Sequence, residues 1–81
     1  MSHNMIGKHI RFYREANKWS QEVFAEKLGL SLTYIGMLER GEKLPKLETF
    51  IRIANTLEVS ADQLLMDELG TGYSIQSSEL T

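Results

Sequence analysis

The side chains able to bind a polyanion are concentrated in one part of the chain. All nine lysines and arginines lie in residues 1–52, where six acidic residues leave a net charge of +3. Residues 53–81 hold five acidic residues and no basic one, so the whole chain carries a net charge of −2. This distribution favours one surface that faces a polyanion and another that is turned away from it. A chance asymmetry in a short chain is the alternative.

Residue types that carry catalysis or bind metals are sparse. The chain has no cysteine, which excludes a disulfide scaffold, cysteine-bound zinc, iron–sulfur clusters and thiol catalysis. His3 and His9 have no partner at metal-ligand or catalytic-triad spacing, so both are expected to face solvent. The sequence contains no phosphate-binding loop, HExxH motif or paired-carboxylate arrangement. We therefore expect no catalytic residue, no metal and no cofactor.

The length of the chain sets the scale of the structure that positions these side chains. Its 81 residues, with a mass of 9.3 kDa, make one small domain, and an apolar fraction of 42% is enough for a compact core. No apolar run approaches the roughly 20 residues that span a bilayer, and the N-terminus lacks a signal-peptide pattern. The sequence therefore predicts a cytoplasmic protein without a membrane partner.

The spacing of apolar residues predicts an all-α domain of five helices. Residues 1–4 have no pattern and are expected to form a disordered leader. A first amphipathic helix is predicted from Ile6 to about Asn17. The others are expected at 21–28 after the N-cap Ser20, at 32–40 after the N-cap Ser31, at 47–57, and up to about Leu69 after a capping box of Ser60 and Gln63.

The second and third of these helices have the spacing of a helix-turn-helix. They are short and joined by three to four residues, with Gly29 expected in the left-handed conformation that ends a helix. Ala25 is small enough for the two helices to cross closely, and Leu30 fills the angle between them. Four residues of the third helix are left to point outward on a face that a DNA major groove could admit, namely Leu32, Thr33, Gly36 and Met37.

The order of motifs along the chain extends this interpretation. Ser-Gln-Glu-x-Phe-Ala-x-Lys-Leu-Gly at 20–29 and Ser-x-x-Tyr-Ile-x-x-Leu-Glu-Arg-Gly at 31–41 resemble lambda-repressor-like (Cro/XRE-type) DNA-binding domains. So do Pro-x-Leu-Glu-Thr at 45–49 and Leu-x-Val-Ser at 57–60. The resemblance implies a five-helix helix-turn-helix domain over residues 5–69 that binds double-stranded DNA as a dimer.

Three positions depart from the family pattern, all of them near helix ends. Val23 stands where the family often has Glu, which loses a capping box, and Lys46 replaces the usual Ser or Thr cap. Glu58 sits where Gly is common. We expect these departures to cost some stability at the helix ends and to leave the outward face of the third helix unchanged.

The resemblance assigns base reading to Leu32, Thr33, Gly36 and Met37. Only Thr33 among them has a side chain that can form hydrogen bonds, so contacts with thymine methyl groups and DNA shape are the expected means of recognition. Packing of this face against a protein partner is the alternative, because an exposed apolar patch usually marks an interface.

Phosphate contacts are expected to flank the base-reading face. By the resemblance, Gln21 uses the first turn of the second helix, where unpaired N–H groups attract an anion. Arg40, Lys43 and Lys46 surround the loop after the third helix, where the family straddles the DNA backbone. Solvated surface charge is the alternative for each of these three cations. Tyr34 either reaches a phosphate or packs at the flank of the helix.

Two further positions are expected to be structural. Arg14 and Glu39 match a family pair in which an Arg from the first helix orients the recognition helix and neutralises a partly buried carboxylate. Trp19, between the first two helices, is expected to fill a space in the core.

Together these features predict a sequence-specific transcriptional regulator, most often a repressor in this family, that binds a near-palindromic operator. A homodimer is expected because one recognition helix reads too few bases to be selective. Its interface is predicted on the fourth and fifth helices and the tail at 70–81, which carry the leftover apolar residues Leu65, Met66, Leu69 and Ile75. Two alternatives stay open: an antitoxin or other module with a regulatory protein partner, and the DNA-binding part of a longer regulator whose next helix begins in the tail.

Overall fold

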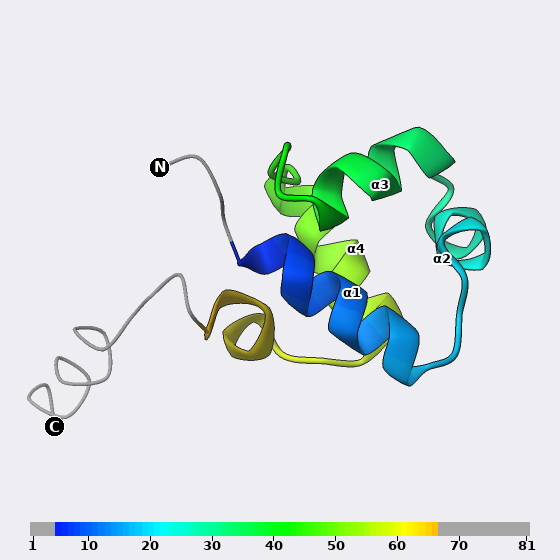
Figure 1. The fold of residues 1–81 in the computed structure, drawn as a ribbon. Coiled ribbons are helices and arrows are strands. Elements are labelled where there is room, and N and C mark those ends of the chain that lie inside the picture. The colour runs from blue at the N-terminus through cyan, green and yellow to red at the C-terminus, as the bar shows by residue number, and fades with distance from the viewer. Residues whose placement is uncertain (1–4, 67–81) are drawn as a thin grey trace, which may run out of the picture.

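A computed structural model describes residues 5–66 of the chain (Figure 1). The described part is all-helical, as the apolar spacing predicts. The predicted leader at 1–4, the end of the fifth helix and the tail at 70–81 lie outside the described residues. The elements are α1 (Ile6–Ala16), α2 (Gln21–Leu28), α3 (Leu32–Glu39), α4 (Leu47–Leu57) and a fifth helix over residues 61–66.

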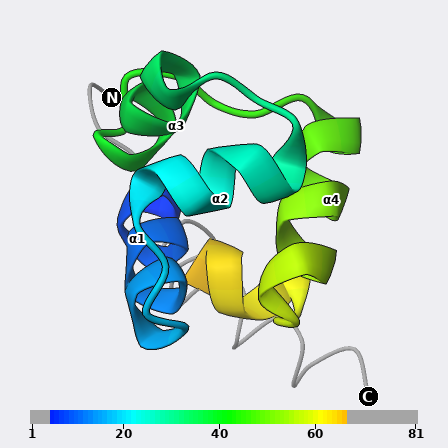
Figure 2. The same cartoon turned by 90° about the vertical axis from the view of Figure 1, so that its right-hand side faces the viewer.

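The helices form a bundle in which α2 and α3 lie at one end. Figure 2 shows α1 and α4 on opposite sides, with α2 running between them and the fifth helix, drawn in orange, below α2. The helix α3 lies along the upper edge of the molecule in Figure 1, where it packs mainly against α1 and α2. One side of α3 is therefore anchored to the bundle while the other faces solvent.

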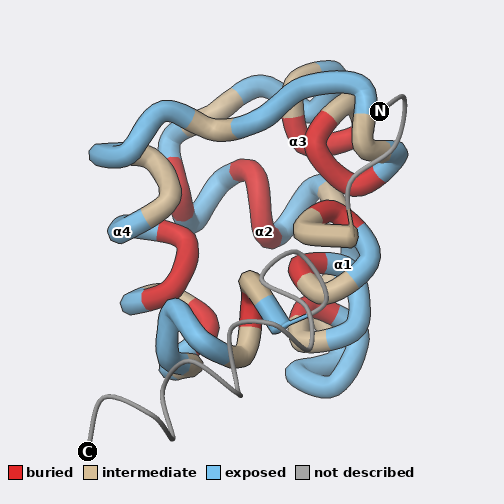
Figure 3. Tube along the Cα trace, turned by 90° about the vertical axis from the view of Figure 1, so that its left-hand side faces the viewer, coloured by how far each residue is buried: buried red, intermediate tan, exposed pale blue. Residues whose placement is uncertain are grey.

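The core is built from one side of every helix, and Figure 3 shows these buried stretches alternating with exposed ones along each helix. The spacing of α4 also predicts a buried Leu47, which is wrong: as the first residue of the helix its side chain is 75% exposed. The buried apolar residues are Ile10, Phe24, Ala25, Leu28, Ile35, Leu38, Ile53, Ala54, Leu57 and Leu64.

Local capping signals set the helix starts as predicted. The hydroxyl of Ser20 accepts the Val23 backbone N–H at 3.0 Å, and that of Ser31 accepts the Tyr34 N–H at 3.1 Å. Ser60 and Gln63 form the reciprocal capping box, with hydrogen bonds of 2.8 and 3.1 Å. These side chains satisfy backbone donors that a helix start otherwise leaves without partners.

The departures from the family pattern have visible consequences at helix ends. Lys46 is the N-cap of α4 and makes no side-chain hydrogen bond there. Glu58 ends α4 in the left-handed conformation, with φ of 60°. A side chain in this conformation costs roughly 1–2 kcal/mol, because its Cβ crowds the following carbonyl, whereas Gly has no Cβ.

Candidate nucleic-acid interface

The turn between α2 and α3 has the geometry of a helix-turn-helix. Gly29 ends α2 with φ of 69°, in the left-handed region that its sequence position predicts. The backbone N–H of Leu30 then donates to the carbonyl of Ala25 at 2.9 Å, and the Leu30 side chain packs against the core. This tight turn lets α3 begin at once on the outside of the bundle.

The predicted base-reading residues do not all face outward equally. Leu32 is 44% exposed and Thr33 is also exposed, whereas Met37 is half-buried. Gly36 is buried, which corrects the expectation of an outward position. The cover comes from Arg40, whose Nη1 would lie 3.0 Å from a Cβ added at Gly36. The side chain of Arg40, one helical turn beyond Gly36, therefore covers this position.

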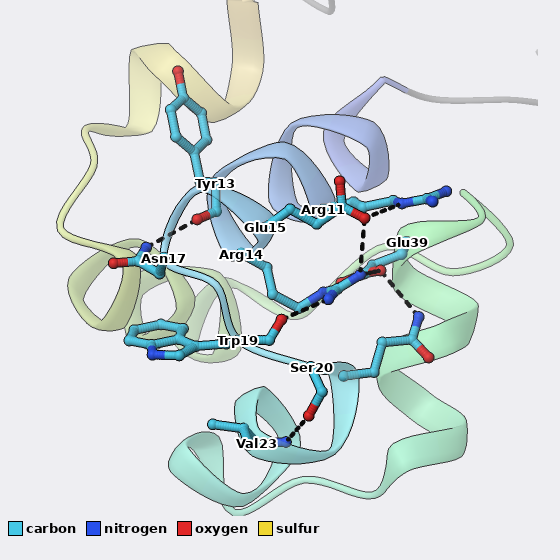
Figure 4. A network of polar contacts seen from close by, with 10 residues as sticks. Arg11, Tyr13, Arg14, Glu15, Asn17, Trp19, Ser20, Val23 and Glu39 are labelled. Atoms are coloured by element: carbon cyan, nitrogen blue, oxygen red, sulfur yellow. Dashed lines mark hydrogen bonds and ion pairs between the residues drawn. The ribbon is translucent and has the colours of Figure 1, made fainter.

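A buried ion pair ties α3 to α1 (Figure 4). Arg14 donates from Nε to Glu39 Oε2 at 2.6 Å and from Nη2 to Glu39 Oε1 at 3.0 Å. Its third nitrogen, Nη1, donates to the carbonyl of Trp19 at 2.7 Å, so the guanidinium is held on three sides. The hydrogen bond with Glu39 raises the pKa of Arg14 above its ordinary value. Burial opposes this shift, and the negative charge of Glu39 adds to it.

Gln21 joins this buried pair, which sequence reasoning missed. Its Nε2 donates to Glu39 Oε1 at 3.0 Å, so this oxygen accepts from Gln21 and Arg14 together. Gln21 is half-buried as a result, at the start of α2. Nothing local in the sequence signals a contact between residues 18 positions apart, because it depends on the angle at which α2 and α3 cross.

Gly7 allows α1 to approach the end of α3, and it too was missed by sequence reasoning. A Cβ at Gly7 would lie 2.1 Å from the Leu38 carbonyl oxygen and 2.8 Å from that of Glu39. Both contacts are with backbone atoms that cannot move without shifting α3. The absence of a side chain at this position therefore sets how closely the two helices pack.

The predicted phosphate-binding cations lie around the C-terminal end of α3. Lys43 and Lys46 are exposed. Arg40 is exposed too, but it pairs with Glu42, from Nε to Oε2 at 2.7 Å and from Nη2 to Oε1 at 3.3 Å. The Arg40 guanidinium lowers the pKa of the Glu42 carboxyl below its ordinary value, mainly through this hydrogen bond.

The sequence is similar to those of known helix-turn-helix proteins. The family model described as helix-turn-helix matches residues 10–64. The transcriptional regulator YazB of Bacillus subtilis, itself uncharacterised, is 37% identical over 68 residues, which are 84% of this chain and 99% of YazB. The control protein C.SmaI of Serratia marcescens is 43% identical over 61 residues, 75% of this chain and 73% of C.SmaI. The chain belongs to the Cro/C1-type helix-turn-helix family of DNA-binding transcriptional regulators.

A solved structure of a relative contains DNA. The crystal structure of SinR, described as the master regulator for biofilm formation, in complex with DNA superposes with a TM-score of 0.70. The two sequences are 32% identical, and the match covers 75% of this chain and 98% of the SinR chain. In helix-turn-helix proteins the second helix of the motif is the one that enters the major groove, and α3 holds that position in this chain.

Tyr34, on α3, and Trp19, between α1 and α2, both pack inward. Tyr34 is half-buried against the core, which corresponds to the flank packing that the sequence left open. Trp19 is also packed on the core, where its ring stacks on Phe24 with centroids 6.2 Å apart and planes at 21°. The Lys27 ammonium lies 4.6 Å from the centre of the indole ring.

His9 is not solvated as predicted. Its Nδ1 donates to the carbonyl of Leu64 at 2.9 Å, and its side chain is half-buried. Beside it, Gln63 Nε2 lies 3.4 Å from the hydroxyl of Tyr13. These contacts connect α1 to the fifth helix and give His9 a structural role that its isolated position in the sequence does not reveal.

The predicted dimer face is only partly described. Met66 is 58% exposed, Leu65 is half-buried, and Leu69 and Ile75 lie outside the described residues. Leu65 lines an apolar groove of about 330 Å³ between the start of α1, the loop before α4 and the fifth helix. The other lining residues are Ile6, Leu44, Pro45, Leu47 and Phe50.

Between residues 5 and 66, no helix is long and apolar enough to cross a membrane. The same part of the chain contains no group of three acidic or histidine side chains that could hold a metal ion.

Proposed function

We propose that this protein is a cytoplasmic, sequence-specific transcriptional repressor that binds a near-palindromic operator as a homodimer, with α3 in the major groove. The exposure of Leu32 and Thr33 at the start of α3 carries the proposal. These two residues lie at the N-terminal end of the recognition helix, the end that contacts base edges in helix-turn-helix complexes.

Base reading is assigned to one stripe of α3. Thr33 can form a hydrogen bond with a base edge, and the apolar side chains of Leu32 and Met37 can contact thymine methyl groups. Gly36, the fourth residue of the stripe, has no side chain and lies beneath the Arg40 guanidinium. Because this stripe is mostly apolar, DNA shape is expected to contribute to specificity at base pairs that no side chain contacts.

Phosphate binding is assigned to the flanks of the stripe. Gln21 uses one of its two amide N–H groups on Glu39, which leaves the other for a phosphate oxygen beside the N-terminus of α2. Lys43 and Lys46 are exposed on the loop between α3 and α4 and contact the backbone on the other side of the groove. The hydroxyl of Tyr34 is a further candidate at the flank.

The homodimer is proposed to form through the fourth and fifth helices and the tail. The exposed Met66 and the apolar groove beside Leu65 support this assignment, since large exposed apolar surfaces mark interfaces. Sedimentation of the full chain with and without operator DNA tests it. A monomer at all concentrations in both conditions would exclude the dimer while leaving DNA binding by one copy possible.

The decisive experiment distinguishes residues that contact phosphates from residues that contact bases. Selection from random duplex DNA gives the operator, and affinities are then measured over a range of salt concentrations. Lys43→Ala and Lys46→Ala should weaken all duplexes about equally and reduce the slope of log affinity against log salt by about one. Thr33→Ala and Met37→Ala should shift preference among operator variants by roughly 1–3 kcal/mol per position with little change in slope.

The alternative, a module that binds a protein partner, makes a different prediction in the same experiment. If Thr33→Ala and Met37→Ala weakened binding to every duplex equally, α3 would not be reading the groove. Its apolar face would then be an interface for a regulatory protein, as in an antitoxin.

A further inference from the structure

The base-reading stripe of α3 lacks the side chain best suited to recognise a purine. Among Leu32, Thr33, Gly36 and Met37, only Thr33 forms hydrogen bonds, and none can make a bidentate contact. An Arg that donates to both O6 and N7 of guanine is the commonest specific contact in the major groove. The geometry at the end of α3 supplies such a group.

Arg40 belongs to the same stripe as the base-reading residues. It lies seven, four and three positions after Thr33, Gly36 and Met37, so the helical repeat places it on their side of α3. Its guanidinium bends back over the helix: a Cβ at Gly36 would lie 3.0 Å from Nη1 and 3.8 Å from Nη2. The positive charge therefore lies over the middle of the stripe instead of projecting from its end.

Glu42 holds the guanidinium in this place and leaves one edge of it free of the carboxylate. Its two oxygens accept from Nε at 2.7 Å and from Nη2 at 3.3 Å. A guanidinium carries five N–H groups, of which this contact uses one on Nε and one on Nη2. The Nη1–Nη2 edge keeps a donor on each nitrogen, in the fork geometry that fits two neighbouring acceptors.

We propose that Arg40 reads a guanine in the major groove through its Nη1–Nη2 edge, while Glu42 fixes the guanidinium and Gly36 provides the space for it. This role replaces the phosphate contact that the sequence assigns to Arg40. It rests on the proposed DNA binding by α3. Glu42 is a positioning residue, because it acts on the base only through Arg40.

The test measures base preference at each position of the operator found by selection. For the wild type, replacing one operator guanine by adenine, or by 7-deazaguanine, which lacks the N7 acceptor, should weaken binding roughly 10- to 100-fold. Arg40→Gln should abolish this preference at that position alone. Arg40→Lys should keep the charge and the salt dependence but lose most of the preference, because an ammonium cannot make the bidentate contact.

Lys43→Gln is the matched control, a neighbouring exposed cation that is proposed to contact phosphate. It should weaken binding to all sequences and leave every base preference in place. If Arg40→Gln behaves like Lys43→Gln, with a lower salt slope and unchanged preferences, Arg40 contacts phosphate and the proposal is wrong.

Glu42→Gln tests the positioning role. It should reduce the guanine preference several-fold, and it should have no further effect on that preference in an Arg40→Gln background. If it strengthens binding to all sequences equally in both backgrounds, Glu42 acts only by repelling DNA, and its positioning role is excluded. If the wild-type protein prefers no DNA sequence at all, the proposed function itself is wrong. If the wild type has a preference that the Arg40 variants keep, only the role of Arg40 is wrong.

Discussion

Glu39 and Arg40 are neighbours in sequence, and each forms an ion pair through two contacts, yet the two pairs lie in opposite environments. In the pair of Arg14 with Glu39 the side chains are 9% and 3% exposed. In the pair of Arg40 with Glu42 they are 58% and 53% exposed. The buried pair of Arg14 and Glu39 therefore anchors α3 to α1, whereas the exposed pair of Arg40 and Glu42 remains accessible to a ligand.

The difference follows from where α3 ends. Glu39 is the last residue of the helix and faces α1, which approaches closely at Gly7. Arg40 is the C-cap, turned by about 100° around the helix axis relative to Glu39, and faces solvent. A buried pair is costly to break because the remaining charge has lost its hydration, whereas either member of an exposed pair is solvated when its partner is removed.

The largest expected effect comes from breaking the buried pair. Glu39→Ala should lower the free energy of unfolding by about 3 kcal/mol, because it leaves the Arg14 guanidinium buried without its carboxylate and removes the acceptor of Gln21. Denaturant unfolding followed by circular dichroism measures this loss. A change within about 1 kcal/mol would mean that the pair behaves like an exposed one.

The two glycines beside these pairs should respond to alanine in opposite directions. Gly7→Ala should destabilise the fold by roughly 1–3 kcal/mol, because its Cβ meets backbone oxygens of α3. Gly36→Ala should stabilise it by about 0.5–1 kcal/mol, because the atoms nearest to the new Cβ belong to the movable end of Arg40 and alanine favours the helix. Thermal unfolding of both variants measures whether stability falls in Gly7→Ala and rises in Gly36→Ala. An equal loss of stability in both variants would contradict the prediction.

The exposed pair should matter little for folding. Glu42→Ala should leave the denaturant midpoint where it is in the wild type, because Arg40 is solvated without its partner. The same denaturation series as for Glu39→Ala makes the comparison direct. A clear loss of stability would show that Arg40 depends on Glu42 for the fold and not only for its orientation.

The smallest effect is expected in the titration of Glu42. Its pKa is lowered from the ordinary 4.5 by Arg40, so in wild-type protein the carboxyl should titrate below that value, and in Arg40→Gln it should return toward it. With a lowered pKa in the folded state, the contribution to stability is present above pH 4.5 and is lost as the pH falls below it. Carboxyl carbon chemical shifts followed by NMR measure both values, and identical curves would mean that the pair does not persist in solution.

The amino-acid sequence alone determined the helices, their caps and the family. Helix periodicity and capping depend on residues three or four positions apart, and so Ser20, Ser31 and Gly29 marked the helix-turn-helix before any packing was known. The same spacing places five apolar residues of α2 and α3 inward, and all are buried: Phe24, Ala25, Leu28, Ile35 and Leu38. The pairing of Arg14 with Glu39 was implied by resemblance, because no short-range rule connects residues 25 positions apart.

Only the tertiary structure decided how these elements meet. The bond from His9 to Leu64 spans 55 positions, and that from Gln21 to Glu39 spans 18, so both depend on how the helices cross. The sequence predicted solvent around His9 and an outward Gly36, and both predictions were wrong because a neighbouring helix or side chain occupies that space. Spacing along a helix fixes which residues share a face, whereas packing angles and rotamers fix what that face touches.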